Sequence, residues 1–297
     1  MLRVGSWSKG VLALLLIAAA VPAVAGLGDV SAPSLAGVQG PKHAMPLLGG
    51  SPLPIGSEPE PTVDQLIYHG GPITKYPKVF LTFWGWSLTG DPFNVAPYLQ
   101  AFLAGQGGTA WAAVQNQYYD NERGFITNPS GQLHGVWFDD TLQYPPIPDL
   151  FVYNEAQLAA EHFGYDRDAE YVIAIPNNLG NAEFGLVYCA WHSSVTNQAG
   201  QEVAFTNLPY IPNAGGSCGM NSVNGGAAGQ LDGVSIVEGH EHSEVITDPH
   251  LDAWYDANGA ENADKCAWNG LRNINTATGT FAIQPNWSNA IAGCSTG

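Results

Sequence analysis

The chain has 297 residues, of which 26 are Asp or Glu and nine are Lys or Arg, so its net charge at pH 7 is −17. A surface this acidic repels phosphate backbones, which excludes nucleic acid as a partner class. An acidic balance suits a protein that recruits cations, although it also serves solubility alone.

The first 25 residues have the pattern of a signal peptide. Arg3 and Lys9 supply positive charge, residues 11–20 are apolar, and residues 23–25 (Ala-Val-Ala) form a small-residue cleavage site. The apolar stretch is shorter than the ~20 residues that a membrane-spanning helix needs, and no later stretch reaches that length. We therefore expect a secreted, extracellular protein with no membrane contact after signal removal.

The chain contains four cysteines, which in an exported protein most simply form two disulfides. Three pairings are open. We favour the sequential pairing, Cys189 with Cys218 and Cys266 with Cys294, in which each bond closes a loop of similar length. Each bond would stabilise the fold by about 3–4 kcal/mol in the chain-entropy model. A cysteine metal site is the weaker interpretation because the chain has no C-x-x-C pair.

The mature chain divides by composition into two parts. Residues 26–65 are rich in Gly, Pro, Ser and Ala and predict a linker or pro-segment that cannot bury enough apolar surface to order itself. Residues 66–297 are long enough for a single globular domain with its own core.

The apolar pattern of the domain alternates between strands and helices. In chain order we expect a strand at 78–84, helices at 95–104 and 111–118, a strand at 135–138, a helix at 155–163 with Asn154 as its N-cap, strands at 171–175, 184–191 and 202–208, a loop at 213–229, a helix at 232–247, and short extended pieces at 254–256 and 281–284. This order predicts an α/β or α+β domain in which helices flank a mixed sheet.

The late helix, at residues 232–247, has an unfavourable composition for a helix. Glu238, Glu241 and Glu244 follow one another at i, i+3 spacing, and each like-charged pair costs roughly 0.2–0.5 kcal/mol. Asp248 follows at the negative end of the helix dipole, and Pro249 ends the helix there. A bound cation would offset all of these repulsions.

The spacing within this helix fits a metal site. His240 and Glu244 are four residues apart and so lie one turn above each other on the same face. They can hold one ion, with Glu241 beside them as a general base. The motif is the H-E-x-x-H arrangement of zinc peptidases with Glu in place of the second His. We expect a divalent metal, zinc first and calcium as the alternative.

Such a site needs a third ligand from elsewhere in the chain. We favour Asp264 or Glu261, because Cys266 would tie their loop down. Asp248, His250 and Tyr255 are additional candidates. The late helix places His242 about 160° from Glu244, so it should support the site indirectly or face solvent. His192 and Ser193 could supply a catalytic pair, but we interpret them as the polar end of a strand.

The late cluster also resembles a known protein family. The matching stretches are Gly239-His240-Glu241-x-x-Glu244, Asp248-Pro249, Ala253-Trp254-Tyr255, Glu261-x-x-Asp264-x-Cys266 and, before the first strand, Tyr68-His69-Gly70-Gly71-Pro72. Over most of residues 66–294 they resemble the plant Exordium (phosphate-induced) family and its bacterial secreted relatives. The resemblance implies an extracellular protein and a shared site, but no particular reaction.

Two functions follow from these patterns. The first is a secreted, zincin-like metal-dependent hydrolase, a peptidase with a peptide or protein substrate, in which Glu241 faces an open groove beside an edge strand at residues 202–208. The second is a non-catalytic, Exordium-like extracellular protein in which the same residues hold a structural cation or a hydrogen-bonded network. A buried and paired Glu241 would favour the second function.

Overall fold

The computed structural model describes residues 41–49, 65–141 and 149–297, which all belong to one compact unit spanning residues 38–297. The predicted signal peptide, at residues 1–25, lies outside the described residues, as does most of the predicted linker at 26–65. In the part of the chain that the structure describes, no helix is both long and apolar enough to cross a membrane.

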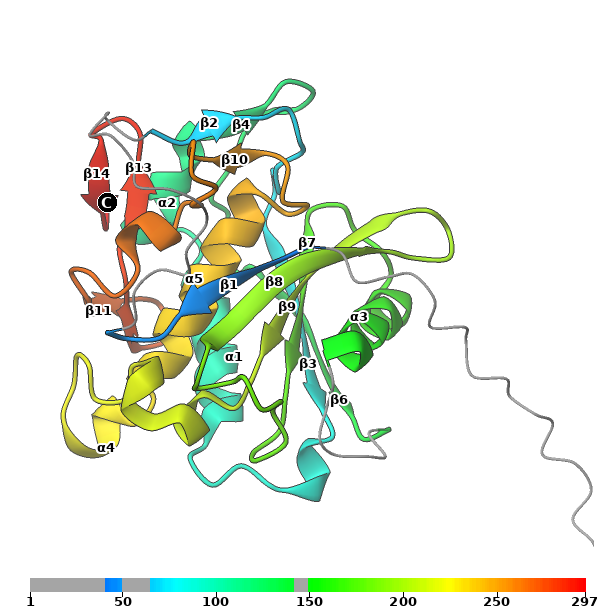
Figure 1. The fold of residues 1–297 in the computed structure, drawn as a ribbon, viewed down its shortest axis with the longest axis vertical. Helices are drawn as coiled ribbons and strands as arrows, with labels where there is room; N and C mark the ends of the chain where they lie inside the picture. The colour runs from blue at the N-terminus through cyan, green and yellow to red at the C-terminus, as the bar shows by residue number, and fades with distance from the viewer. Residues whose placement is uncertain (1–40, 50–64, 142–148) are drawn as a thin grey trace, which may run out of the picture. The chain divides into compact units, whose positions relative to one another are not determined.

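A six-stranded mixed sheet forms the centre of the domain (Figure 1). In spatial order its strands are β1 (Lys42–Pro46), β8 (Tyr188–Thr196), β9 (Glu202–Leu208), β7 (Ala169–Ala174), β3 (Lys78–Trp84) and β6 (Leu133–Asp139). The strands from β9 to β6 are parallel to one another, whereas β8 is antiparallel to β9 and β1 is antiparallel to β8. All six residues of β7 are buried, as expected of a parallel strand covered on both faces.

Helices cover both faces of the sheet (Figure 1). The first face packs against α1 (Val95–Gly105) and α5 (Asp232–Thr247), and the second packs against α3 (Asp149–Phe163). This arrangement confirms the prediction of a mixed α/β domain with flanking helices.

The remaining elements are short. They are the helices α2 (Ala110–Ala113) and α4 (Gly226–Gly229), the 3₁₀ segments Trp86–Leu88, Val114–Gln117, Ile211–Cys218 and Asp264–Cys266, and the two-stranded ladders of β2 (Ile67–Tyr68) with β10 (Trp254–Tyr255), β4 (Tyr119–Asp120) with β5 (Gly124–Phe125), β11 (Arg272–Asn275) with β12 (Thr280–Ile283), and β13 (Asn286–Ser288) with β14 (Gly293–Ser295).

Several predicted boundaries need correction. Helix α3 begins at Asp149, so Asn154 lies inside the helix and is not its N-cap. The strand predicted at 184–191 is β8, which begins at Tyr188 and continues to Thr196. The predicted edge strand at 202–208 is wrong as an edge, because β9 lies between β8 and β7. Hydrogen bonding on both sides leaves β9 no free edge for a substrate.

Residues 41–49 also depart from the prediction, since they belong to the segment expected to lack order. Residues 42–46 form β1, and Met45 is fully buried in the core on the α5 side of the sheet. Five residues of weak local preference are ordered here by pairing with β8, a contact that lies far away in the sequence.

Helix α5 has the predicted bounds and is buried along its whole length. At Asp248 the backbone leaves helical geometry, with φ −149° and ψ 62°, just before Pro249. Gly239 lets the helix approach its neighbours closely, because a Cβ there would lie 3.2 Å from ring atoms of Phe102 and Trp111.

Both predicted disulfides are confirmed, Cys189–Cys218 and Cys266–Cys294. Among the described residues no cysteine is free. Two disulfides are compatible with a chain that folds in an oxidising compartment.

Candidate metal centre

Three polar side chains of α5 project into one fully buried region between the helix, β8 and β1. They are His240, Glu241 and Glu244, each with no solvent-exposed surface. Burial of two carboxyl groups and an imidazole is costly unless each is paired or bound. Their surroundings therefore decide what this region can hold.

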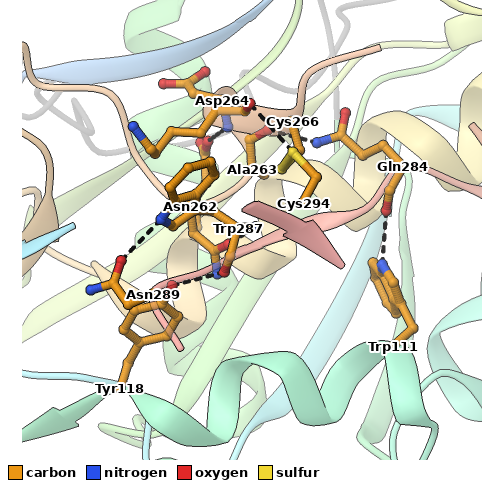
Figure 2. The surroundings of a disulfide bond; sticks show 12 residues. Trp111, Tyr118, Asn262, Ala263, Asp264, Cys266, Gln284, Trp287, Asn289 and Cys294 are labelled. Carbon is orange, nitrogen blue, oxygen red and sulfur yellow. Dashed lines mark hydrogen bonds between the residues drawn. A yellow bond between two sulfur atoms is a disulfide. The ribbon is translucent and has the colours of Figure 1, made fainter. Parts of the chain in front are cut away.

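The loop after β10 brings Glu261 and Asp264 to the same region. Asp264 begins a 3₁₀ turn that ends at Cys266, and the bond from Cys266 to Cys294 anchors the turn to β14 (Figure 2). The adjacent Ala263 carbonyl accepts a hydrogen bond of 2.8 Å from Gln284. The backbone N–H of Asp264 donates to Glu244 Oε1 at 3.0 Å, which ties the loop to the helix.

Two histidines from the sheet complete the cluster. His192 of β8 is fully buried, and His43 of β1 lies directly opposite it in the ladder, with ring centroids 5.8 Å apart. His43 Nε2 pairs with Asp264 Oδ2, and its Nδ1 lies 3.4 Å from Glu261 Oε1. We call the seven residues His43, His192, His240, Glu241, Glu244, Glu261 and Asp264 the buried His/acid cluster.

His240, one of the three ligands favoured from the sequence, lies near both of the others, Glu244 and Asp264, although the three do not form one of the compact ligand groups described below. His240 Nε2 lies 3.1 Å from Glu244 Oε1 and 3.7 Å from Asp264 Oδ1. Two donors bound to one tetrahedral zinc ion at ~2.0–2.1 Å lie ~3.3 Å apart, so these separations are close to those that a shared ion requires.

Glu244 is the common member of three possible ligand groups. The groups are His43/Glu244/Asp264, His192/Glu244/Glu261 and His240/Glu241/Glu244, and the donor atoms within each lie within 4.8 Å of one another. Glu261, the second candidate from the loop, joins through His192, whose Nε2 lies 3.5 Å from Glu261 Oε2. The central position of Glu244 makes it the pivotal ligand of any ion held here.

Several nitrogen and oxygen atoms of the cluster lack hydrogen bonds. Neither ring nitrogen of His240 has a hydrogen-bond partner among the described residues, and the same holds for His192 Nε2 and Glu244 Oε2. The 3.1 Å approach of His240 to Glu244 therefore lacks hydrogen-bond geometry. Buried polar groups are rarely left unpaired, and a metal ion is one of the partners that satisfies them.

Burial, together with the charges of neighbouring groups, perturbs the pKa values of Glu241, Glu261 and Asp264. Burial raises the pKa of Glu241 well above its usual value, and the neighbouring Glu244 and Asp264 raise it further. Burial also raises the pKa of Glu261, and the charges of Asp248 and Glu244 raise it further. Burial also acts to raise the pKa of Asp264, but the charge and hydrogen bond of His43 outweigh it, so this pKa is lowered.

The histidines are perturbed in opposite directions. Burial alone would lower the pKa of His43, but Asp264 outweighs it and raises that pKa to about 9. For His240 burial is likewise outweighed, mainly by the charge of Glu244, so its pKa is raised. The pKa of His192 falls well below its usual value because burial acts together with the charges of His43 and His240. Without a cation, such a cluster must hold protons to remain buried.

Glu241 does not face an open groove in this arrangement. Its side chain has no exposed surface, and Oε2 lies 3.1 Å from His192 Nδ1 at hydrogen-bonding geometry. Strand β1 lies over it, and the backbone of Met45 acts to lower its pKa. The prediction of an exposed general base is therefore wrong for the described form of the chain.

The additional candidates Asp248, His250 and Tyr255 belong to none of the three ligand groups. Asp248 Oδ1 accepts two backbone hydrogen bonds of 2.7 Å that hold the turn after α5. Burial lowers the pKa of His250, and none of the charges acting on it comes from the His/acid cluster. Tyr255 stacks against His69 at 3.6 Å between ring centroids.

His242 faces away from the cluster, as its helix position predicts, but it is buried and does not face solvent. Its Nδ1 pairs with Glu170 Oε2 at 2.5 Å, and its Nε2 pairs with Gln132 Oε1 at 3.0 Å. Glu170 also accepts from Thr206 Oγ1 at 2.5 Å. This second polar network anchors α5 to the centre of the sheet.

The sequence interpretation did not place His192 or His43 in the metal site. His192 was assigned to the polar end of a strand, whereas it lies inside β8 and is flanked by buried residues. An isolated histidine within a strand does not reveal its neighbours, and His43 lies in a segment whose order depends on β8. A buried-strand pattern interrupted by His-Ser was the one available indication for His192.

No family model, no curated protein and no solved structure matches the chain. Function is therefore inferred from the geometry of the His/acid cluster and from the fold around it.

Proposed function

We propose that the chain is a secreted protein that binds a divalent cation in the buried His/acid cluster. The observation that carries this proposal is the position of His240 Nε2, which lies 3.1 Å from Glu244 Oε1 and 3.7 Å from Asp264 Oδ1, while both ring nitrogens of His240 lack hydrogen-bond partners among the described residues. A cation there would relieve the repulsion that contributes to the raised pKa values of Glu241 and Glu261.

Zinc is the ion we propose, with His240, Glu244 and Asp264 as ligands and His43 or His192 as the fourth. Zinc combines imidazole nitrogen and carboxylate oxygen in a tetrahedral shell. Calcium takes six to eight oxygen ligands and does not favour imidazole, so the three histidines of the cluster argue against it.

The described geometry supports cation binding better than catalysis. A structural ion is enclosed by protein, whereas a catalytic ion keeps an open position. Glu241, the only candidate base adjacent to His240 in the chain, is buried and paired with His192. These contacts favour a cation that stabilises the fold, and the sequence resemblance and signal-peptide pattern suggest that the protein is extracellular and similar to the Exordium family.

The test is the metal content and stability of the purified mature chain. We expect close to one equivalent of a divalent ion, and a fall in Tm of several degrees when a chelator removes it, because an ion that binds only the folded state stabilises that state. The His240→Ala and Glu244→Ala variants should lose the ion. His242→Ala is the matched control, since His242 lies on the same helix but pairs with Glu170 and Gln132 instead. A metal-free chain with unchanged Tm would rule out the centre.

A metal-dependent peptidase is the second candidate, and one observation favours it. The cover over Glu241 is β1, which lies within the segment predicted to be a linker or pro-segment. Removal of β1 would leave Glu241 beside the ion, where zinc, when bound, lowers the pKa of water and the carboxylate can take its proton. In this zincin-like form, peptide hydrolysis should require release of β1, respond to chelator, and disappear in Glu241→Gln while the ion is retained.

A further inference from the structure

Strand β1 covers the free edge of β8 and one wall of the metal centre at the same time. It pairs antiparallel with β8 from Lys42 opposite Ser193 to Pro46 opposite Tyr188. Without β1, strand β8 would be the edge of the sheet, because its other side is hydrogen bonded to β9. An exposed sheet edge is a template that extended peptides bind by adding a strand.

Groups outside the ladder also hold the backbone of residues 41–49. Ser193 Oγ donates to the Pro41 carbonyl at 2.7 Å, and Trp268 Nε1 donates to the Pro46 carbonyl at 2.7 Å. The backbone N–H of Leu48 donates to the Ser217 carbonyl at 2.8 Å. These contacts recognise main-chain atoms, so they would hold any peptide that follows the same path.

Side chains of β1 add selectivity on both faces of the strand. Lys42 pairs with Asp149 at 2.5 Å, and its Nζ lies 5.2 Å from the ring centroid of Trp191. Met45 is fully buried on the opposite, α5 side. Between them, His43 reaches Asp264 and Glu261 of the metal centre. The strand in this site therefore has a basic residue, then a residue that faces the metal centre, and an apolar residue three positions after the basic one.

Strand β1 itself has the features of a weakly held edge strand. It has five residues, its register shifts between Ala44 and Pro46, and Pro46 has no N–H to donate to a ladder. Short length, a register shift and proline all reduce the hydrogen bonding of an edge strand. The ladder between β1 and β8 is therefore shorter and less regular than a straight edge strand would give.

We propose that the edge of β8 is a binding site for an extended peptide with a basic residue followed three positions later by an apolar residue, and that residues 42–46 occupy this site within the same chain. A peptide of this kind displaces β1, pairs with β8 and brings its central residue to the metal centre in place of His43. The site selects for basic peptides because Asp149 and the acids of the cluster surround it. The inference rests on the proposed cation in one respect: the central residue of the peptide takes the place of His43 beside the ion.

The test uses the full chain and a fluorescent peptide with the sequence of residues 41–49. The double variant Lys42→Glu/Met45→Asp weakens the resident strand on both faces and leaves β8 unchanged. We expect it to bind the peptide ~10-fold or more tightly than the wild type, in which the resident strand competes for the site. Phe138→Asp is the matched control, since Phe138 is exposed on β6 at the opposite edge of the sheet. This variant should bind the peptide only as weakly as the wild type.

A peptide in which Glu and Asp replace the Lys and Met should not bind the double variant. A folded double variant that does not bind the original peptide would overturn the proposal. If the double variant does not fold, hydrogen exchange on the wild type decides the question. Millimolar peptide should speed the exchange of residues 42–46, and unchanged exchange would equally overturn the proposal. Metal analysis of the same samples distinguishes the cation centre from the peptide site. A chain that contains the ion but does not bind the peptide would contradict only the peptide site. A metal-free chain that binds the peptide would contradict only the cation centre.

Discussion

Glu155 in α3 is a buried carboxyl group on the opposite face of the sheet from α5. Burial raises its pKa to about 9, and the neighbouring carboxylate of Asp139 contributes in the same direction. The folded chain therefore keeps a proton that the unfolded chain releases near pH 4.5. Because the folded state binds the extra proton, this residue lowers the free energy of unfolding progressively as pH rises from about 4.5 toward 9.

The Glu155→Gln variant should remove this pH dependence. Its amide is neutral at every pH and still offers a donor toward Asp139. We expect similar Tm values for variant and wild type at pH 5 and a higher Tm for the variant at pH 8, by at least ~2 °C. Thermal unfolding at both pH values measures the difference. An equal gap at pH 5 and pH 8 would mean that Glu155 is not the group that titrates.

At the scale of the element, α5 depends on two glycines that play different parts. A Cβ at Gly233 would lie 2.0 Å from the backbone carbonyl oxygen of Cys218, whereas one at Gly239 would lie 3.2 Å from aromatic ring atoms of Phe102 and Trp111. The backbone of Cys218 cannot move aside as an aromatic side chain can. Glycine is therefore sterically required at position 233 but not at position 239. Both substitutions to Ala gain ~1 kcal/mol of helix propensity.

Gly233→Ala should therefore lower the free energy of unfolding by ~1–3 kcal/mol, as overpacking does, while Gly239→Ala should change it by less than ~1 kcal/mol. Urea unfolding of the two variants at one pH gives the comparison through their midpoints. A larger loss for Gly239→Ala than for Gly233→Ala would contradict this account of how α5 is packed.

The elements that sequence analysis predicted well are those with local causes. Helix α5 has an apolar and acidic pattern of full helical length and ends before Pro249, so its bounds and the convergence of His240 with Glu244 could be predicted. The position of Asp264 near His240 and Glu244 could be predicted because the disulfide at Cys266 anchors its loop. In each case the decisive residues lie near one another in the chain or are joined by a covalent bond.

The elements that it missed have non-local causes. Residues 42–46 have only a weak local preference for extended structure, and they form β1 because they pair with β8. The position of β9 inside the sheet depends on which neighbours pair with it, and nothing in residues 202–208 encodes that choice. His43 and His192 are opposite each other in this ladder, so both were missed for the same reason.

At the scale of the whole molecule, the two disulfides close loops of nearly equal length, with separations of 29 and 28 residues. Chain entropy predicts similar stabilisation from each, about 3–4 kcal/mol. Their effects on the proposed centre should differ, because Cys266 lies two residues after Asp264, whereas Cys189 lies in β8, a strand that has a partner strand on each side.

Replacing each cysteine pair by serine should therefore lower Tm by similar amounts. Only the Cys266→Ser/Cys294→Ser chain should also bind the cation distinctly more weakly, by ~10-fold or more, since its ligand loop is no longer tethered. Thermal unfolding of the metal-free chains and metal titration of the same samples separate the two effects. Equal loss of metal affinity in both variants would show that the loop is held by other contacts.

The pairing of His43 with Asp264 joins residues 221 positions apart. Contacts at such separation form late, because the entropy of closing a long loop must be met before they stabilise anything, and folding slows as the mean separation of contacts grows. The complete cluster can thus exist only after nearly the entire chain has been synthesised and has collapsed onto its sheet. Where His43 is the fourth ligand of the proposed cation, ion capture is complete only at the end of folding, so its rate during refolding should match the slowest phase of the refolding kinetics.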